Sequence, residues 1–437
     1  MNISTGCKSL ATLLLAAVLA SCGGSDEKGG DDPKIRLLNL SSGYSSLDLM
    51  TNIDTDEDDD DETQLEDVAL ESVSEFVTLD PDDYTIKLRR SGSGSVLRSF
   101  TGEELVEDTI NTYVAYGEVG QFGALRIDES LDDADAGENT LLVANVSTAG
   151  SLDIYLTEPN TDLDDTTPVL SGVGSALASV TADSGSYRLR AVAAGDTSDV
   201  RLDIANFTLT DKGVGTLILT STQGGMLANA VYLPRQGTSL TKFANTKARI
   251  RGAVALANGA NATIQVSNTT ILTAATAGVI ASRYTLMDAG NLPVNLSVNG
   301  TPVTVPNAAL TAGADYTLMV WSNAAGPQTS LIVDDNRLPA GGSGMTKLRV
   351  LNGMSTLAAP ITLSVDFSPI IEGTLLGQAS DEEEISAGTD RQFDISNTST
   401  AAPVLTRGAI TLQGNSVYTF FMTDNGATAI GVLRRDR

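Results

Sequence analysis

The sequence contains no histidine, two cysteines and one tryptophan in 437 residues. The absence of histidine removes the usual general base near neutral pH and the commonest metal ligand. Cys7 lies inside a predicted export signal and Cys22 directly follows it, so we expect no disulfide, thiolate nucleophile or cysteine metal site. A serine triad would be incomplete without histidine, and no nucleophile-elbow motif occurs. The sequence therefore predicts a protein that is not an enzyme.

Basic residues are also scarce, since 27 Lys and Arg stand against 55 Asp and Glu, which gives a net charge of −28. So acidic a surface repels nucleic acid and keeps a protein soluble, and we exclude nucleic acid as a partner. Aromatic residues make up only 5% of the chain. Trp321 falls on an alternating segment, and we expect it to be a core residue and not a platform for a sugar ring.

Residues 1–21 have the order of a secretory signal, with Lys8 before an apolar run that ends at a small residue. The run is shorter than the roughly 20 residues that span a bilayer. Leu19, Ala20, Ser21 and Cys22 resemble the bacterial lipobox residue for residue. The resemblance implies cleavage before Cys22 and a diacylglycerol on its sulfur, so that a lipid anchor makes the membrane a partner. The alternative is an ordinary signal peptide with an incidental cysteine.

Gly23 follows the lipobox, where an aspartate would imply retention at the inner membrane. The resemblance therefore implies an anchor in the outer membrane, facing either the periplasm or the cell exterior. Residues 22–33 are polar and rich in glycine, which is typical of a flexible tether.

Four similar segments follow the tether. KIRLLNLSSGYSSLDLMT from Lys34 aligns with NTLLVANVSTAGSLDIYLTE from Asn139, and fainter copies start at Lys247 and Lys347. The starts are about 100 residues apart, the size of an immunoglobulin-type sandwich. Each opening is followed by alternating segments bounded by Gly, Asp, Asn and Ser, which is typical of half-buried antiparallel strands.

The sequence therefore predicts an all-β chain of four tandem immunoglobulin-like antiparallel β-sandwich modules, over residues 34–137, 138–238, 246–342 and 345–437. Tyr84, Tyr187 and Tyr284 occupy one place in the first three modules, near the start of an alternating segment. We expect core tyrosines whose hydroxyls fix a neighbouring turn, as in the tyrosine corner.

The opening motif and the Leu-Asp-aliphatic triplets at Leu47 and Leu152 resemble the DUF4397 family, whose members are exported and surface-attached proteins with immunoglobulin-like sandwiches. The first two modules carry the resemblance. Modules three and four keep only part of the pattern, and the Leu-Asp pair is missing there. The family has no established activity, so the resemblance implies no functional residues.

An acidic run from Asp54 to Glu62 interrupts the first module. Alternate acids provide the oxygen ligands that calcium prefers, so Asp54, Asp56, Asp58, Asp60 and Glu62 are a candidate for weak calcium binding. The other interpretation is a solvated loop, because like charges repel one another and the loop lacks the glycine of an EF-hand. Residues 162–165 of the second module carry the same two interpretations. No other cofactor is predicted.

These features predict a lipid-anchored protein of the cell envelope that acts as a non-catalytic structural or interaction scaffold. The alternative is an array of binding modules for an envelope or extracellular polysaccharide or for a partner protein. A hydrolase that uses only carboxylates is a third hypothesis, and it requires two buried acids close together in a cleft.

Overall fold

The computed structural model describes residues 30–53, 61–356, 359–397 and 402–437. These residues form strands, turns and one short 3-10 helix, η1 (Gly342–Gly344). The prediction of an all-β chain is therefore confirmed. None of the helical structure in the described ranges is long and apolar enough to cross a bilayer.

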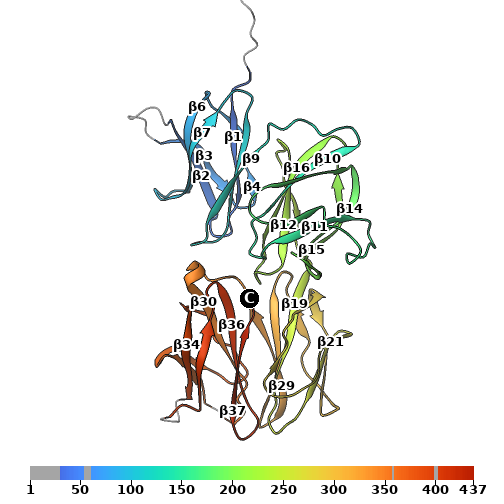
Figure 1. Cartoon of the computed structure of the whole chain (residues 1–437), viewed down its shortest axis with the longest axis vertical. Helices are drawn as coiled ribbons and strands as arrows, with labels where there is room; N and C mark the ends of the chain where they lie inside the picture. The colour runs from blue at the N-terminus through green and yellow to red at the C-terminus, as the bar shows by residue number, and fades with distance from the viewer. Residues whose placement is uncertain (1–29, 54–60, 357–358, 398–401) are drawn as a thin grey trace, which may run out of the picture.

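The strands form four sandwiches in chain order (Figure 1). The first contains β1 (Lys34–Leu40), β2 (Ser46–Ile53), β3 (Glu62–Ala69), β4 (Ser72–Val73), β5 (Val77–Thr78), β6 (Asp82–Arg90), β7 (Val96–Leu105), β8 (Ile110–Tyr116) and β9 (Gly123–Asp128). The second contains β10 (Glu138–Asn145), β11 (Leu152–Thr157), β12 (Leu170–Val173), β13 (Ala178–Asp183), β14 (Gly185–Ala193), β15 (Asp196–Leu209), β16 (Gly213–Ser221), β17 (Ala228–Pro234) and β18 (Thr241–Phe243).

The third contains β19 (Lys247–Ala255), β20 (Ala262–Val266), β21 (Thr269–Ala275), β22 (Val279–Ile280), β23 (Thr285–Asp288), β24 (Gly290–Leu292), β25 (Val294–Val298), β26 (Thr301–Val303), β27 (Ala308–Leu310), β28 (Asp315–Asn323) and β29 (Gly326–Asp334). The fourth contains β30 (Met345–Asn352), β31 (Ile361–Val365), β32 (Ser368–Thr374), β33 (Glu383–Ser386), β34 (Gly388–Asn397), β35 (Leu405–Leu412), β36 (Ser416–Asp424) and β37 (Ala429–Arg435).

The four sandwiches share one strand order. One sheet of each, called the inner sheet below, has the orders β4-β1-β8-β9, β13-β10-β16-β17-β18, β22-β19-β28-β29 and β33-β30-β36-β37. The other, the outer sheet, has the orders β3-β2-β6-β7, β12-β11-β14-β15, β21-β20-β25-β26 and β32-β31-β34-β35. The shared order extends to the third and fourth sandwiches, where the sequence resemblance was faint.

The central pair of each inner sheet is parallel: β1 with β8, β10 with β16, β19 with β28 and β30 with β36. The sequence predicted antiparallel strands throughout, and the remaining pairs are antiparallel. Parallel neighbours need a crossover connection. Here the chain provides it by passing through the outer sheet before it returns beside the first strand.

Each outer sheet has a bulge at the same place, between its first and second strands in chain order. The bulged residues Asp67, Gly172, Ala274 and Gly373 have φ values of 52°, 64°, 45° and 75°. A bulge adds one residue to one strand and increases the local twist. The same distortion therefore recurs in all four sandwiches, although glycine occupies it in only two.

The inner sheets pack against one another in pairs. Leu38, Val114 and Ile127 of the first sandwich meet Ile218 and Val231 of the second in one apolar cluster. A corresponding cluster joins Ala253 and Met319 of the third sandwich to Leu351 and Phe421 of the fourth. The inner strands are thus buried on both faces, and this explains apolar runs such as IRLLNL in β1, which do not alternate.

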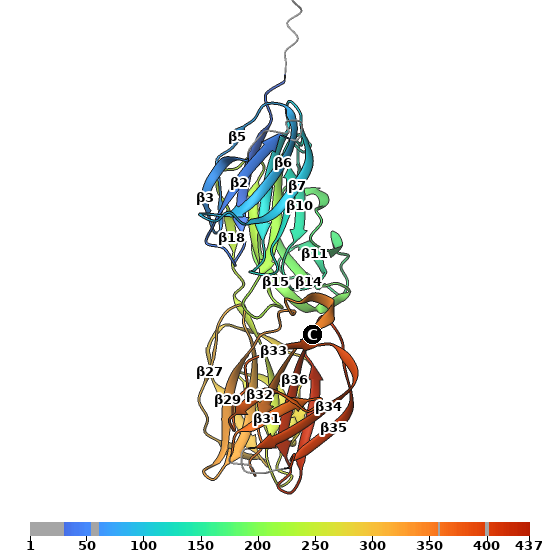
Figure 2. The same cartoon turned by 90° about the vertical axis from the view of Figure 1, so that its left-hand side faces the viewer.

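The result is a block of two sandwich pairs stacked end to end (Figures 1 and 2). The first and second sandwiches form the pair nearer Lys34, and the third and fourth form the other. The end of β37 lies at the junction between the pairs (Figure 1). Residues 30–33, assigned to the tether from the sequence, already contact the first sandwich, where Leu79 donates a backbone hydrogen bond of 3.0 Å to Pro33.

Candidate functional site

The predicted site residues lie largely outside the described part of the chain. This holds for Cys22 and for Asp54, Asp56, Asp58 and Asp60. Glu62 is the first residue of β3 and is exposed, and Asp61 beside it forms an ion pair with Lys87. In the described ranges there is no group of three or more His, Cys, Asp or Glu side chains placed to hold a metal ion.

The second acidic patch forms a compact turn. Asp162 accepts a hydrogen bond of 3.1 Å from the backbone of Asp164, and Thr197 donates to the Asp164 carboxylate. Leu163, between these acids, is buried against Tyr155 and Val192 on the outer sheet. Leu163 therefore packs the turn onto a sheet face, while Asp162, Asp164 and Asp165 are exposed.

The aspartate of the Leu-Asp triplet has a structural role at the bulge. Asp153 accepts hydrogen bonds from the backbone N–H of Gly172 (2.7 Å) and Gly195 (2.9 Å). In the first sandwich Asp48 accepts the bond from bulged Asp67 at 3.0 Å. In the third, Thr263 accepts the same bond from Ala274 at 3.0 Å. The third module lacks the Leu-Asp pair, and there the Thr263 hydroxyl accepts the hydrogen bond from the bulged residue that an aspartate accepts in the first two modules.

The inner faces carry a repeated buried set of an arginine, a threonine and an acid. The arginine is on the first strand, the threonine is its parallel partner, and the acid lies at the end of the last inner strand. The sets are Arg36, Thr112 and Glu129; Arg251, Thr317 and Asp334; and Arg349, Thr419 and Asp436. The three arginine side chains are at most 2% exposed.

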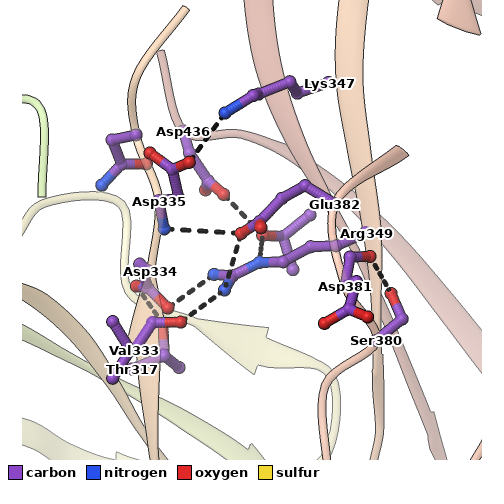
Figure 3. A network of polar contacts seen from close by, with 12 residues as sticks. Thr317, Val333, Asp334, Asp335, Lys347, Arg349, Ser380, Asp381, Glu382 and Asp436 are labelled. Atoms are coloured by element: carbon purple, nitrogen blue, oxygen red, sulfur yellow. Dashed lines mark hydrogen bonds and ion pairs between the residues drawn. The ribbon is translucent and has the colours of Figure 1, made fainter. Parts of the chain in front are cut away.

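In the second pair the two sets exchange partners across the interface, and Figure 3 shows the part of this network around Arg349. Arg349 donates to its own Thr419 at 3.0 Å and to Asp334 of the third sandwich at 2.6 Å. Arg251 donates to its own Thr317 at 2.9 Å and to Asp436 of the fourth sandwich. The arrangement has approximate two-fold symmetry, and each buried guanidinium is bound by an acid of the other sandwich.

Opposite charges compensate one another throughout this network. Burial raises the pKa of Asp334, but Arg349 and Arg251 outweigh it and hold the pKa below its ordinary value. Burial lowers the pKa of Arg349, and Asp334 and Asp436 reverse that shift. Tyr284 lies between the guanidinium groups of Arg249 and Arg251, each 4.7 Å from its ring centre. Asp334 is thus held in its ionised form by the two arginines.

The first pair has only half of this network. Arg36 donates to Glu129 at 2.6 Å and to the carbonyl of Gly237 in the second sandwich at 2.5 Å. In the second sandwich Leu142 occupies the strand position that Arg36 has in the first, and it pairs with Thr216. Arg235 occupies the position that corresponds to Glu129. The first pair therefore has one buried arginine set where the second pair has two.

A glycine turn joins the two pairs. Gly224 and Gly225, between β16 and β17, pack so closely that a Cβ on Gly224 would lie 2.7 Å from the backbone nitrogen of Asp315, and one on Gly225 2.7 Å from that of Arg337. Gly224 donates a backbone hydrogen bond of 2.9 Å to Gly313, and Asn336 donates one of 3.1 Å to Gly224. Backbone from both pairs is thus in direct contact at this junction.

Charged side chains reinforce the junction. Arg337, in the connection between the third and fourth sandwiches, makes two hydrogen bonds of 2.8 and 2.9 Å to Glu118 of the first. Arg437 donates to the carbonyls of Gly225 and Asn336, both at 3.1 Å, and to that of Thr148. Burial, together with the nearby Arg201 and Arg249, lowers the pKa of Arg437 to about 10.

A cavity of about 500 Å³ opens beside these contacts. Its walls come from the first sandwich (Tyr116, Glu118), the second (Thr148, Thr220) and the connection that contains Arg337. Lys347 and Glu384 of the fourth sandwich complete it. Concave sites of this size at domain interfaces are the usual places for small ligands.

A second, more open groove of about 660 Å³ lies between β29 and residues 377–382. Two of its acids, Asp335 and Glu382, are already bound within the protein. Although burial raises the pKa of Asp335, hydrogen bonds from Arg337 and Lys347 lower it to about 2. Burial raises the pKa of Glu382, which lies 3.7 Å from Arg349 (Figure 3).

The aromatic predictions have mixed outcomes. Tyr84 and Tyr187 donate to the carbonyls of Asp80 (2.9 Å) and Asp183 (2.8 Å), which confirms that their hydroxyls fix turns. Tyr284 departs from this pattern, because its hydroxyl donates to Asp334 at 2.6 Å in the interface network. Trp321 is partly buried, and it lies between the inner sheets of the second pair instead of in a sandwich core.

The arginine sets and the cavity were not predicted from the sequence. The arginines were visible as the repeated KIR, RIR and KLR openings, but their role depends on inner sheets packing face to face. The cavity combines residues from three sandwiches, and no local pattern marks it.

Residues 33–155 match the family described as Domain of unknown function (DUF4397). The match covers the first sandwich and continues through β10 and most of β11 of the second, which is the part of the chain that carried the resemblance. No curated protein gives a match to the chain.

Proposed function

We propose that the chain is a lipid-anchored protein of the bacterial outer membrane that acts as a non-catalytic structural or interaction scaffold. The observation that carries this proposal is the joining of the four sandwiches into one block by the buried arginine networks and the Gly224–Gly225 turn. Buried charges so fully compensated favour one fixed arrangement of the sheets. A fixed block at the end of a tether suits presentation of surfaces.

The acids support the non-catalytic part of the proposal. General acid and base catalysis by two carboxylates needs one acid with a raised pKa beside an ionised partner, both open to substrate. Asp334 and Asp436 are bound by arginine and threonine, and their side chains are each 1% exposed. Groups held in this way are suited to structure.

The anchor is tested by labelling cells with an alkyne-bearing fatty acid. We expect the full chain to take up the label and to stay with the membrane fraction. Cys22→Ala should abolish the label and release the protein, whereas Cys7→Ala, the matched control, should change neither. A labelled Cys22→Ala protein would overturn the lipid anchor. Protease treatment of intact cells separates surface display from a periplasmic orientation.

A second function, binding of a polysaccharide or a partner protein, is favoured by the cavity at the junction of the pairs. A ligand there would contact both pairs at once, so its binding would stabilise their docked arrangement.

A further inference from the structure

The charged groups around the junction cavity are already engaged within the protein. Arg337 is bound by Asp335 and Glu118, and Lys347 lies 2.8 Å from the Asp335 carboxylate. Glu384 accepts a backbone hydrogen bond from Ala340 at 2.8 Å. An ionic ligand would have to compete with these contacts, so the cavity offers little to a charged molecule.

The groups that remain free at the wall are neutral. Tyr116, Ser175 and Thr220 line the cavity, and their hydroxyls have no hydrogen-bond partner among the described residues. Asn229 uses its side-chain oxygen to accept from the backbone of Asn245 at 2.9 Å, which leaves its NH₂ group free. Three hydroxyls and an amide can both donate and accept hydrogen bonds.

Apolar surface lies between these polar groups. Val119 and Leu70 line the cavity while remaining 69% and 40% exposed. Leu338 and the ring of Tyr116 contribute further apolar wall. The cavity thus presents apolar patches and uncharged hydrogen-bonding groups side by side, which suits a molecule with hydroxyl edges and a carbon face.

Backbone pairing argues against an extended peptide. Thr220 and Asn229 are paired residues on β16 and β17, in the interior of their sheet. Their backbone groups belong to the sheet ladder, so this wall has no free strand edge for an added strand. On this wall, side chains must make the recognition.

We propose that the junction cavity binds an uncharged saccharide, such as a short segment of a neutral polysaccharide. This inference rests on the second of the two functions above. The net charge of −28 also favours a neutral glycan over an acidic one, because it repels acidic glycans.

The test uses the full chain in detergent and measures binding by calorimetry. Binding should also raise the melting temperature of the protein. The probes are maltotriose, cellotriose and chitotriose at millimolar concentration, with a trigalacturonate, trialanine and trilysine as comparators. We expect at least one neutral trisaccharide to bind and the comparators not to bind. Failure of all three sugars, or a preference for a charged probe or a peptide, would overturn the proposal.

Three variants locate the site: Tyr116→Phe, Ser175→Ala and Thr220→Val. Each removes a hydroxyl that has no partner among the described residues, so the melting temperature without sugar should not change. Each should weaken sugar binding roughly 2- to 10-fold, the usual effect of one lost hydrogen bond. Thr181→Val, an exposed threonine of β13 outside the cavity, is the control and should bind normally.

Unchanged binding in all three variants would place the sugar elsewhere and overturn the assignment of the cavity. Neither a lack of sugar binding nor unchanged binding in the variants would contradict the proposed lipid anchor and scaffold, because the Cys22→Ala experiment tests the anchor without any ligand.

Discussion

Arg349 shows how a single residue contributes to the block. Its side chain is 2% exposed, and it remains charged because Asp334 and Asp436 surround it. Removing one member of such a set leaves the other charges buried without compensation. That loss typically costs about 3–5 kcal/mol.

We therefore expect Arg349→Leu to lower the free energy of unfolding by about 3–5 kcal/mol, measured by urea denaturation. Leu142 occupies the same position in the second sandwich, which shows that this strand position accommodates leucine. The exposed Arg90 gives the control, and Arg90→Leu should change stability by less than about 0.5 kcal/mol. Equal losses for the two variants would contradict a special role for the buried set.

Asp335 predicts a dependence on pH. Its pKa of about 2 in the folded state lies below its ordinary value of 3.8, so the folded state favours the ionised form. The resulting stabilisation, about 2 kcal/mol, is complete above about pH 4 and is lost as the pH falls through about 2. The difference in unfolding free energy between the natural chain and Asp335→Asn should therefore shrink between about pH 5 and pH 2. A constant difference over that range would show that the ionised form is not responsible.

At the level of single strands, the recurrent bulge is the feature that the four outer sheets share. The bulge does not require glycine, because Asp67 and Ala274 occupy it in the first and third sandwiches. A left-handed backbone nevertheless costs residues other than glycine roughly 1–2 kcal/mol. Asp and Asn tolerate this conformation better than β-branched residues do.

We expect Gly172→Val to lower the free energy of unfolding by about 1–2 kcal/mol and Gly172→Asn by clearly less. The matched control is Gly174→Val, since an added Cβ would meet open space at either glycine but only Gly172 has a left-handed φ. Urea denaturation of the three variants measures the difference. An equal effect at position 174 would show that the backbone conformation is not the cause.

The elements also show what sequence reasoning could reach. Alternating segments and turn residues identified the strands around Tyr84 and Tyr187, because strand pattern and turn chemistry are local properties. The function of Asp153 was not predictable, since it depends on a bulge in a neighbouring strand. Arg251 and Arg349 stood in the opening motifs, but only packing between sandwiches buries them. The cavity required the folded arrangement of distant segments.

The arrangement of the whole molecule depends on the contacts between its two pairs. Between β18 and β19 the chain passes once from one pair to the other, and the other contacts are non-covalent. The Gly224–Gly225 turn lies at the centre of these contacts, with no room for a side chain on Gly225.

We expect Gly225→Val to separate the pairs without unfolding the sandwiches. Small-angle X-ray scattering should show a larger radius of gyration, while circular dichroism retains the strand signal. Gly300→Val is the matched control, since Gly300 also has a positive φ but faces open space in the turn between β25 and β26. An unchanged radius in Gly225→Val would show that the turn does not hold the pairs together.

The face-to-face packing of the inner sheets also determines how far the protein extends. Four sandwiches joined end to end would extend over four domain lengths, whereas the paired block extends over two and is broader (Figure 1). The protein is therefore shorter and broader than a single file of four sandwiches would be. Four outer sheets face away from the paired interfaces, two in each pair, so the block presents four separate sheet faces to its surroundings.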